Sequence, residues 1–330
     1  MRWQMKIQLH VAFIAIAYPL AAEQIVVYHS VKDFVAESAA ERFEKETGIQ
    51  VRLVPDNGPA EGKGLSDRLL AEANRPSADV LWARDPLSAI ILKSKGLSAP
   101  YESPNIKNLP KVYSDPEHHW TGFPAGAVVI LYNQNLLSDP EEAPTSVLDM
   151  MNPRFNGKAC MANPLFGITS MYAAALFEVL DTEFAEVFFN SLKTNKVAIL
   201  SSTSEVGRRV ATGEFTFGVA DTDDLYAAVK EDKPVGALFP DQKAFGTLVI
   251  PNVLVLLAHA PNPEQAKQFI DFLLRPEIQK LLATGGVETS REAMPPLNRI
   301  KSMQVDYGKL ASESKELSQG FLKEWIKTEK

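Results

Sequence analysis

The residues with the clearest capacity for chemistry are three aspartates, Asp221, Asp223 and Asp224. They follow residues 215–220, an apolar run that predicts a buried strand. Carboxylates just past the carboxyl end of a strand lie where open α/β sheets bind ligands. Such a cluster can contact a cation or the hydroxyls of a ligand. The alternative is that it serves only as a helix-capping turn.

Two predicted helix starts favour the opposite charge. Gly167, Ile168, Thr169 and Ser170 open one helix, and Thr203 and Ser204 open another. A helix N-terminus presents free backbone N–H groups and the positive end of the helix dipole to an anion. The same hydroxyls also occur as ordinary N-caps. Together with the aspartates, these starts predict a ligand that carries both signs of charge or many hydroxyls.

Other constellations are weaker. A calcium loop beginning at Asp221 would need Gly and Glu where the chain has Tyr226 and Asp232. The Gly-rich residues 58–64 lack the GK[ST] ending of a phosphate-binding P-loop. No G-x-S-x-G motif or nucleophile–base pair can be assigned, so we expect no enzyme. A metal site at His118 and His119, with Asp115 and Glu117, remains an alternative.

Composition sets the broad class. The 330 residues are 45% hydrophobic, which suits two domains, and a net charge of −7 disfavours nucleic acid as a partner. The first 22 residues combine basic Arg2 and Lys6 with an apolar segment and Ala21-Ala22, the pattern of a cleaved secretory signal; a first strand or an uncleaved anchor is the alternative. The single cysteine, Cys160, excludes an internal disulfide and a lipid-anchored mature N-terminus.

Strands and helices alternate along the chain, which predicts α/β layers. Strands are expected at residues 25–29, 49–55, 78–83, 127–133, 158–162, 197–200 and 215–220. Helices are expected at residues 33–47, 65–74, 86–95, 145–151, 168–180, 182–194, 205–212, 263–274, 276–283 and 307–330.

This order resembles the periplasmic solute-binding proteins of ABC transporters, in the branch that holds ferric-ion and thiamine binders. The motifs that carry the resemblance are IVVYHS at 25–30, ERFEKETGIQV at 41–51, SADVLWARD at 77–85, SVLDMMNPRFNGK at 146–158, TGEFTFGVADTDD at 212–224 and GTLVIPNVLVLLAHAPNPEQAKQFIDFLL at 246–274. The resemblance implies a type II fold with two α/β lobes, each a mixed sheet flanked by helices. Two strands that cross between the lobes, at residues 125–129 and 249–253, are the expected hinge. Lobe 1 is expected at 23–125 and 250–293, and lobe 2 at 126–249 and 294–330.

The chain departs from the ferric pattern at its aspartates. Ferric binders of this branch place adjacent tyrosines where this chain has Asp223 and Asp224, although Tyr226 lies nearby. Near the first strand the family's histidine falls close to Lys32 or His29, and the carboxylate after the third strand falls at Arg84 or Asp85. Aromatic rings that could stack on a ligand are Trp82, Trp120 and Tyr28. The predicted ligand-binding residues are Tyr28, His29, Ser30, Arg84, Asp85, Gly167, Thr169, Ser170, Thr203, Ser204, Asp221, Asp223, Asp224 and Tyr226.

These observations predict a periplasmic, monomeric substrate-binding component of an ABC importer without a cofactor. Its partners would be a small-molecule ligand and an ABC permease with its ATPase. The expected ligand is organic and cationic, zwitterionic or phosphorylated: thiamine-like, a sugar phosphate or a phosphonate. Ferric ion with a synergistic anion is the alternative ligand. A periplasmic hydrolase on a similar scaffold is the alternative of another class.

Overall fold

The computed structural model describes residues 23–56, 65–108, 113–139, 142–283 and 299–327. The predicted signal peptide and the Gly-rich segment 58–64 lie outside these residues. Within them, ten strands form one hydrogen-bonded network in the order β2-β1-β3-β10-β5-β8-β6-β7, with β4 paired to β10 and β9 to β5. The strands are β1 (Gln24–His29), β2 (Gln50–Pro55), β3 (Val80–Ala83), β4 (Ser98–Ala99), β5 (Thr121–Asn133), β6 (Ala159–Ala162), β7 (Ala198–Leu200), β8 (Phe217–Asp221), β9 (Val235–Leu238) and β10 (Val249–Leu257).

Lobe 1 is built around three parallel strands, β1, β2 and β3. Its helices are α1 (Asp33–Thr47), α2 (Leu65–Ala71), α3 (Leu87–Ser94), α8 (Pro263–Leu273) and α9 (Pro276–Ala283). Helix α1 ends at Gly48, which adopts the left-handed region at φ 77° and donates a hydrogen bond from its N–H to the Glu44 carbonyl. One face of the sheet packs on aromatic rings, with Phe43 edge-on to Phe269 at 5.1 Å between centroids.

Lobe 2 is built around β6, β7 and β8, which are also parallel. Its helices are α4 (Gly167–Leu180), α5 (Thr182–Thr194), α6 (Thr203–Ala211), α7 (Thr222–Lys230), α10 (Tyr307–Gln319) and α11 (Phe321–Lys327). Two short 3-10 helices, Val147–Met151 and Pro153–Phe155, precede β6. The C-terminal helices close this core: α10 lies along α4, and Trp325 Nε1 donates a hydrogen bond to the Phe189 carbonyl at 2.9 Å.

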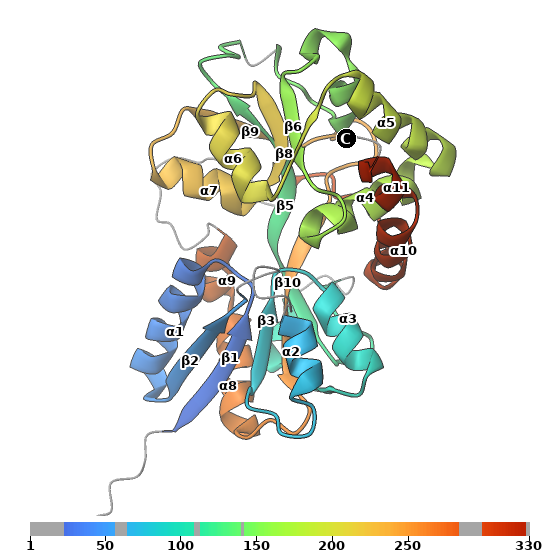
Figure 1. The fold of residues 1–330 in the computed structure, drawn as a ribbon. Helices are drawn as coiled ribbons and strands as arrows, with labels where there is room; N and C mark the ends of the chain where they lie inside the picture. The colour runs from blue at the N-terminus through green and yellow to red at the C-terminus, as the bar shows by residue number, and fades with distance from the viewer. Residues whose placement is uncertain (1–22, 57–64, 109–112, 140–141, 284–298, 328–330) are drawn as a thin grey trace, which may run out of the picture.

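Two antiparallel strands join the lobes (Figure 1). The first half of β5 pairs with β10, and its second half pairs with β8 and β9 in lobe 2. Strand β10 continues into lobe 1, where it pairs with β3 and β4. A register shift between Ile250 and Pro251 interrupts the pairing inside the predicted hinge. The α/β fold with two lobes and two crossing strands is as predicted, whereas the residue boundaries of the lobes stay predictions.

The acidic segment differs from its expected form. Asp221 is the last residue of β8 and also the N-cap of α7, because its side chain accepts a hydrogen bond from the Asp224 N–H. The expected turn is therefore the first turn of a helix. Asp221 and Asp224 are 2% and 3% exposed, so these carboxylates are buried groups and not surface charges.

Candidate functional site

A pocket of about 380 Å³ lies between the lobes at the carboxyl ends of the parallel strands, a volume typical of small-molecule sites. In lobe 1, Ser30 follows β1, Asp56 follows β2, and Arg84 and Asp85 follow β3. In lobe 2, the lining comes from the end of β6, the start of α4, and the segment from β7 into α6. The lobe 2 lining residues are Ala162, Asn163, Phe166, Gly167, Ile168, Thr169, Ser201, Ser202 and Thr203.

The lobe 2 wall offers donors to an anion. Phe166 occupies the N-cap position of α4, and no side chain caps that helix. The first backbone N–H groups of α4 therefore lie at the pocket without a hydrogen bond to a capping side chain. Helix α6 is capped by Ser202, which accepts from the Glu205 N–H, and Thr203 also lines the pocket. Two helix N-termini therefore converge on one pocket.

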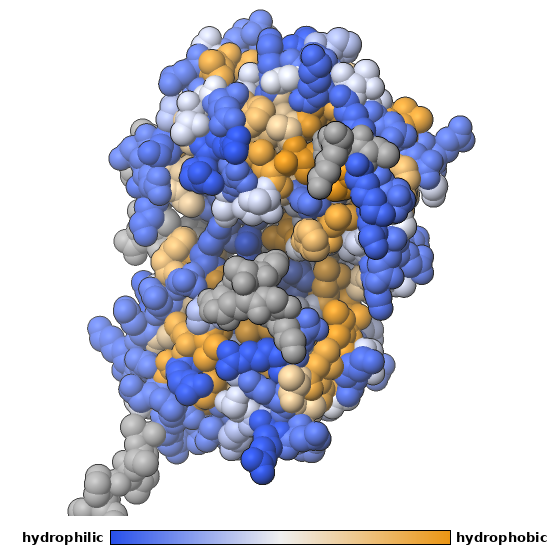
Figure 2. Space-filling model, viewed as in Figure 1, coloured by the Kyte–Doolittle hydropathy of each residue, from blue (hydrophilic) through white to orange (hydrophobic). Residues whose placement is uncertain are grey.

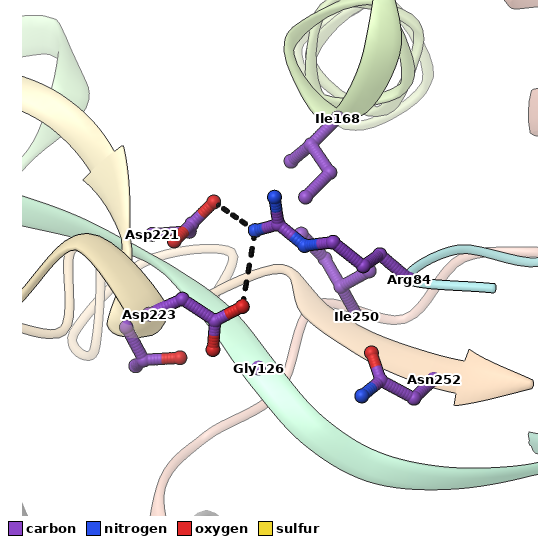
Figure 3. Close-up of a pocket in the computed structure, with 8 residues that line it drawn as sticks. Arg84, Gly126, Ile168, Asp221, Asp223, Ile250 and Asn252 are labelled. Carbon is purple, nitrogen blue, oxygen red and sulfur yellow. Dashed lines mark hydrogen bonds and ion pairs between the residues drawn. The ribbon is translucent and has the colours of Figure 1, made fainter. Parts of the chain in front are cut away.

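Arg84 connects this pocket to the aspartates of lobe 2 (Figure 3). Its Nη2 donates to Asp221 Oδ2 at 2.6 Å and lies 3.2 Å from Asp223 Oδ2. Its backbone N–H donates to the Ser30 hydroxyl, which fixes the start of the side chain. The hollow beside Asp221 and Asp223 holds only about 10 Å³, room for no more than about one water. The aspartates therefore contact Arg84 and not an open cavity.

A second ion pair crosses between the lobes outside the pocket. Lys32 Nζ, at the start of α1, lies 3.2 Å from Asp224 Oδ1 and donates to the Ser204 hydroxyl at 2.9 Å. Ser204 in turn donates to Asp224 Oδ1. The other oxygen of Asp224, Oδ2, is buried without a hydrogen-bond partner. Cations of lobe 1 thus meet acids of lobe 2 at two points.

Burial and neighbouring charges move the pKa values of the three aspartates apart. Burial opposes ionisation of Asp221, but Arg84 and then Lys32 hold its pKa below the ordinary value. Burial raises the pKa of Asp223, and Arg84 opposes this rise. Burial and then the Asp221 charge raise the pKa of Asp224 to about 6. Protonation of Asp224 as the pH falls below about 6 therefore lowers the negative charge of the cluster.

Lobe 1 supplies acceptors to the pocket. Asp85 Oδ1 accepts from the Leu87 N–H at the start of α3, and burial raises the pKa of this carboxyl. Asp56 lies on the same wall and adds to this rise. A ligand amine or hydroxyl would find oxygen acceptors here, across the pocket from the helix N-termini.

The model of the bacterial extracellular solute-binding protein family matches residues 78–307. The chain belongs to this family. Iron uptake protein A1 of Synechocystis is 28% identical to this chain over 274 residues.

 The alignment with Iron uptake protein A1 covers 78% of this chain and 73% of that protein. The putative 2-aminoethylphosphonate-binding periplasmic protein of Salmonella typhi is 28% identical over 250 residues, which covers 72% of this chain and 68% of that protein.

The fold of this solute-binding protein matches solved structures of the same kind. The iron-bound HitA from Pseudomonas aeruginosa superposes with a TM-score of 0.78 at 23% identity, covering 90% of this chain and 98% of that chain. The two-lobed type II fold is thereby confirmed. Members of the family are binding proteins and not enzymes. The Salmonella typhi relative is named as a periplasmic protein. Among the described residues, no helix is long and apolar enough to cross a membrane.

Six of the fourteen predicted ligand-binding residues line the pocket of this solute-binding protein. They are Ser30, Arg84, Asp85, Gly167, Thr169 and Thr203. Asp221 and Asp223 lie beside Arg84, and Ser204 and Asp224 lie in the Lys32 contact. The assignment of ligand-binding residues as a whole stays a prediction.

The structure does not bring the remaining four predicted residues to the pocket. Tyr28 is buried, with its hydroxyl donating to Glu72 and Arg68 over its ring. His29 is 1% exposed and burial lowers its pKa, which favours the neutral ring. Ser170 turns its hydroxyl to the Gly167 carbonyl and to Ser314 of α10. Tyr226 is half-buried on α7, outside the lining of the pocket.

Sequence reasoning missed several lining residues. Asp56, Asn163 and Ser201 each directly follow a predicted strand, so the strand-end rule that singled out Asp221 would have found them too. Ser88 and Phe166 carried no comparable signal, because one lies inside a helix and the other precedes one.

The alternative metal site at His118 and His119 and the candidate stacking rings Trp82 and Trp120 are not formed as ligand sites among the described residues. His119 shares a hydrogen bond with Ser98, and Asp115 pairs with Lys93 at 2.7 Å. In the described part of the chain, no group of three or more His, Cys, Asp and Glu side chains is placed to hold a metal. Trp82 and Trp120 are buried in lobe 1, so neither ring faces the pocket.

Proposed function

We propose that this protein is the periplasmic component of an ABC importer that captures a small organic phosphate or phosphonate between its lobes and delivers it to a membrane permease and its ATPase. The observation that carries the proposal is the convergence of two helix N-termini and the Arg84 guanidinium on one pocket. Helix N–H groups, hydroxyls and a guanidinium are the donors that bind phosphoryl oxygens best.

The carboxylates of lobe 1 narrow the ligand further. Asp56 and Asp85 face the same pocket as the anion donors. A bare anion would be repelled by ionised carboxylates, whereas an amine or a set of hydroxyls would bind to them. The ligand that fits is a phosphate or phosphonate with an amino group or hydroxyls a short distance away. The 2-aminoethylphosphonate named for the Salmonella relative has this chemistry.

The second candidate is ferric ion with a synergistic anion, supported by the Synechocystis relative and the iron-bound structural neighbour. Ferric ion prefers hard anionic oxygens, which Asp56 and Asp85 can supply. Against this candidate, Asp223 and Asp224 are paired with Arg84 and Lys32, and the described residues that line the pocket include no tyrosine.

A hydrolase is the candidate of another class, and the pocket gives it no support. Its hydroxyl groups, such as Ser30 and Ser202, are not hydrogen-bonded to a histidine, and the buried His29 lies outside the lining.

We further propose that the protein acts as a monomer, that residues 1–22 are a cleaved signal peptide, and that the lobes divide at residues 125–126 and 249–250.

The experiment combines native mass spectrometry with isothermal titration. Protein purified from the periplasm is weighed for a bound ligand, and stripped protein is titrated with 2-aminoethylphosphonate, fructose 6-phosphate, inorganic phosphate and ferric citrate. Binding of a phosphate or phosphonate without turnover supports the proposal. Stoichiometric ferric binding with a visible tyrosinate–iron colour, and no binding of the organic compounds, would replace it with the ferric candidate.

A further inference from the structure

Phe166 is the most exposed large hydrophobic residue in the described part of the chain. It is 62% exposed and lies at the N-cap position of α4, with extended backbone at φ −138° and ψ 153°. The next residue, Gly167, has φ +57°, so the chain turns sharply between the Phe166 ring and the helix. Single exposed apolar residues are common on protein surfaces. This one, however, lies on the wall of the interlobe pocket.

The same wall carries other apolar side chains. Ile168 and Ala162 line the pocket next to Phe166, whereas Ser30 and Asp85 line it from lobe 1. The lobe 2 wall therefore has an apolar area around Phe166, close to the anion donors of α4, and polar residues of lobe 1 line the opposite wall. Ile168 also lies against Arg84, as Figure 3 shows, so the apolar side extends to the guanidinium. In the view of Figure 2, hydrophobic residues are visible on the surface of both lobes among broad hydrophilic areas.

We propose that Phe166 determines ligand specificity by covering the carbon skeleton of the ligand while the helix start next to it binds the anionic group. The inference rests on the proposed function and deepens it: the ligand is an organic phosphate or phosphonate whose carbon body presents an apolar or ring face. Contact with such a face removes the ring from water, which is favourable in proportion to the apolar area covered. An inorganic anion or a metal with a small anion would leave the ring exposed.

The test measures affinity by titration calorimetry for three probes that share a phosphate group and differ in what is attached to it: inorganic phosphate, fructose 6-phosphate and phenyl phosphate. The variants are Phe166→Ala, Phe166→Tyr and the control Phe184→Ala, which removes a ring that is 40% exposed on α5, outside the pocket. Phe166→Ala should weaken binding of the organic probes about tenfold and change inorganic phosphate less than about twofold. Phe166→Tyr should restore the organic probes, and Phe184→Ala should behave like the parent protein.

Each other outcome has a definite meaning. An equal loss for all three probes would show that Phe166 only shapes the helix start, and no loss for any probe would show that the ring is not covered; both overturn the inference and leave the proposed function standing. If the parent protein binds none of the probes, and 2-aminoethylphosphonate does not bind either, the proposed function and the inference fail together.

Discussion

Among single residues, Arg84 is central to the site because it lines the pocket and also contacts the aspartates of lobe 2. Asp221 and Asp223 hold its guanidinium from lobe 2, while its backbone is anchored on Ser30 in lobe 1. We therefore propose that Asp221 and Asp223 position Arg84 and do not contact a cation of the ligand. The acidic motif taken alone predicts that the aspartates contact the ligand, because Arg84 lies 137 positions away from Asp221 in the chain.

Replacing Arg84 should therefore affect anion binding strongly. Arg84→Gln removes a charged donor from the pocket and is expected to weaken binding of a phosphate or phosphonate ligand by about 10- to 100-fold. Titration calorimetry measures this change, with circular dichroism to confirm folding. The matched control is Arg275→Gln, whose side chain pairs with Glu46 in lobe 1, and neither residue lines the pocket. Equal losses in both variants would contradict the role of Arg84.

The raised pKa of Asp224 predicts that the stability of the protein depends on pH. Its pKa is raised to about 6 from the ordinary 3.8, so the folded protein binds this proton more readily than the unfolded chain does. Ionised Asp224 therefore costs stability above pH 6, and the cost disappears as pH falls toward 4. Asp224→Asn has no such proton to lose. Its free energy of unfolding, relative to the parent, should rise between pH 4 and pH 7.

Urea unfolding at several pH values measures this slope. The control is Glu183→Gln, which removes an exposed carboxylate at the start of α5, outside the aspartate cluster. A constant difference between Asp224→Asn and the parent at all pH values would contradict the raised pKa.

At the scale of elements, the start of α4 is the part of the site that depends most on backbone geometry. Gly167 occupies the left-handed region at φ +57°, and a Cβ added there would meet no atom within 4 Å. Gly167→Ala should therefore cost about 1 kcal/mol through backbone strain and not through a clash. It should also weaken anion binding, because relief of that strain moves the first N–H groups of the helix.

Gly157 offers a matched control for this variant. It has φ +68°, also with no atom within 4 Å of an added Cβ, and it lies outside the pocket. Gly157→Ala should show the same loss of stability in thermal unfolding and no loss of affinity. If both variants keep full affinity, the backbone of α4 does not bind the ligand.

Local patterns predicted most elements but not their contacts. The apolar spacing of residues 33–47 and the glycine at 48 gave α1 with its observed ends, and α5 was predicted equally well. Strand β5 begins six residues before its expected start at 127, because Gly122 and Pro124 are ordinarily strand breakers that here lie beside β10. Contacts between segments far apart in the chain, such as Lys32 with Asp224, leave no local signal.

At the scale of the whole molecule, Arg84 and Lys32 of lobe 1 form ion pairs with aspartates of lobe 2. Lys32 and Asp224 are not among the residues that line the pocket, so replacing Lys32 should alter lobe closure without removing a lining residue. Lys32→Met is expected to increase the radius of gyration of the ligand-free protein in small-angle scattering, and saturating ligand should reduce it again. About 1 M salt should expand the parent protein in the same direction, because salt screens ion pairs.

The control is Lys45→Met, which removes an exposed lysine of α1 that does not reach lobe 2 in any observed contact. The distance between dyes attached at Glu41→Cys and Glu183→Cys gives a second measurement, since the natural Cys160 is buried and its pKa is raised by burial. An unchanged radius and dye distance in Lys32→Met would contradict the role of this ion pair in closure.

The packing of α10 and α11 on lobe 2 has a consequence for synthesis. Phe189 and Phe177 pack against Phe321, and Phe189 also packs against Trp325, more than 130 positions further along the chain. Before the ribosome has added α10 and α11, the aromatic surface of α4 and α5 has no cover. A nascent chain of this protein therefore cannot complete the core of lobe 2 until residues 307–327 have been synthesised, and chaperones can engage the uncovered surface in the meantime.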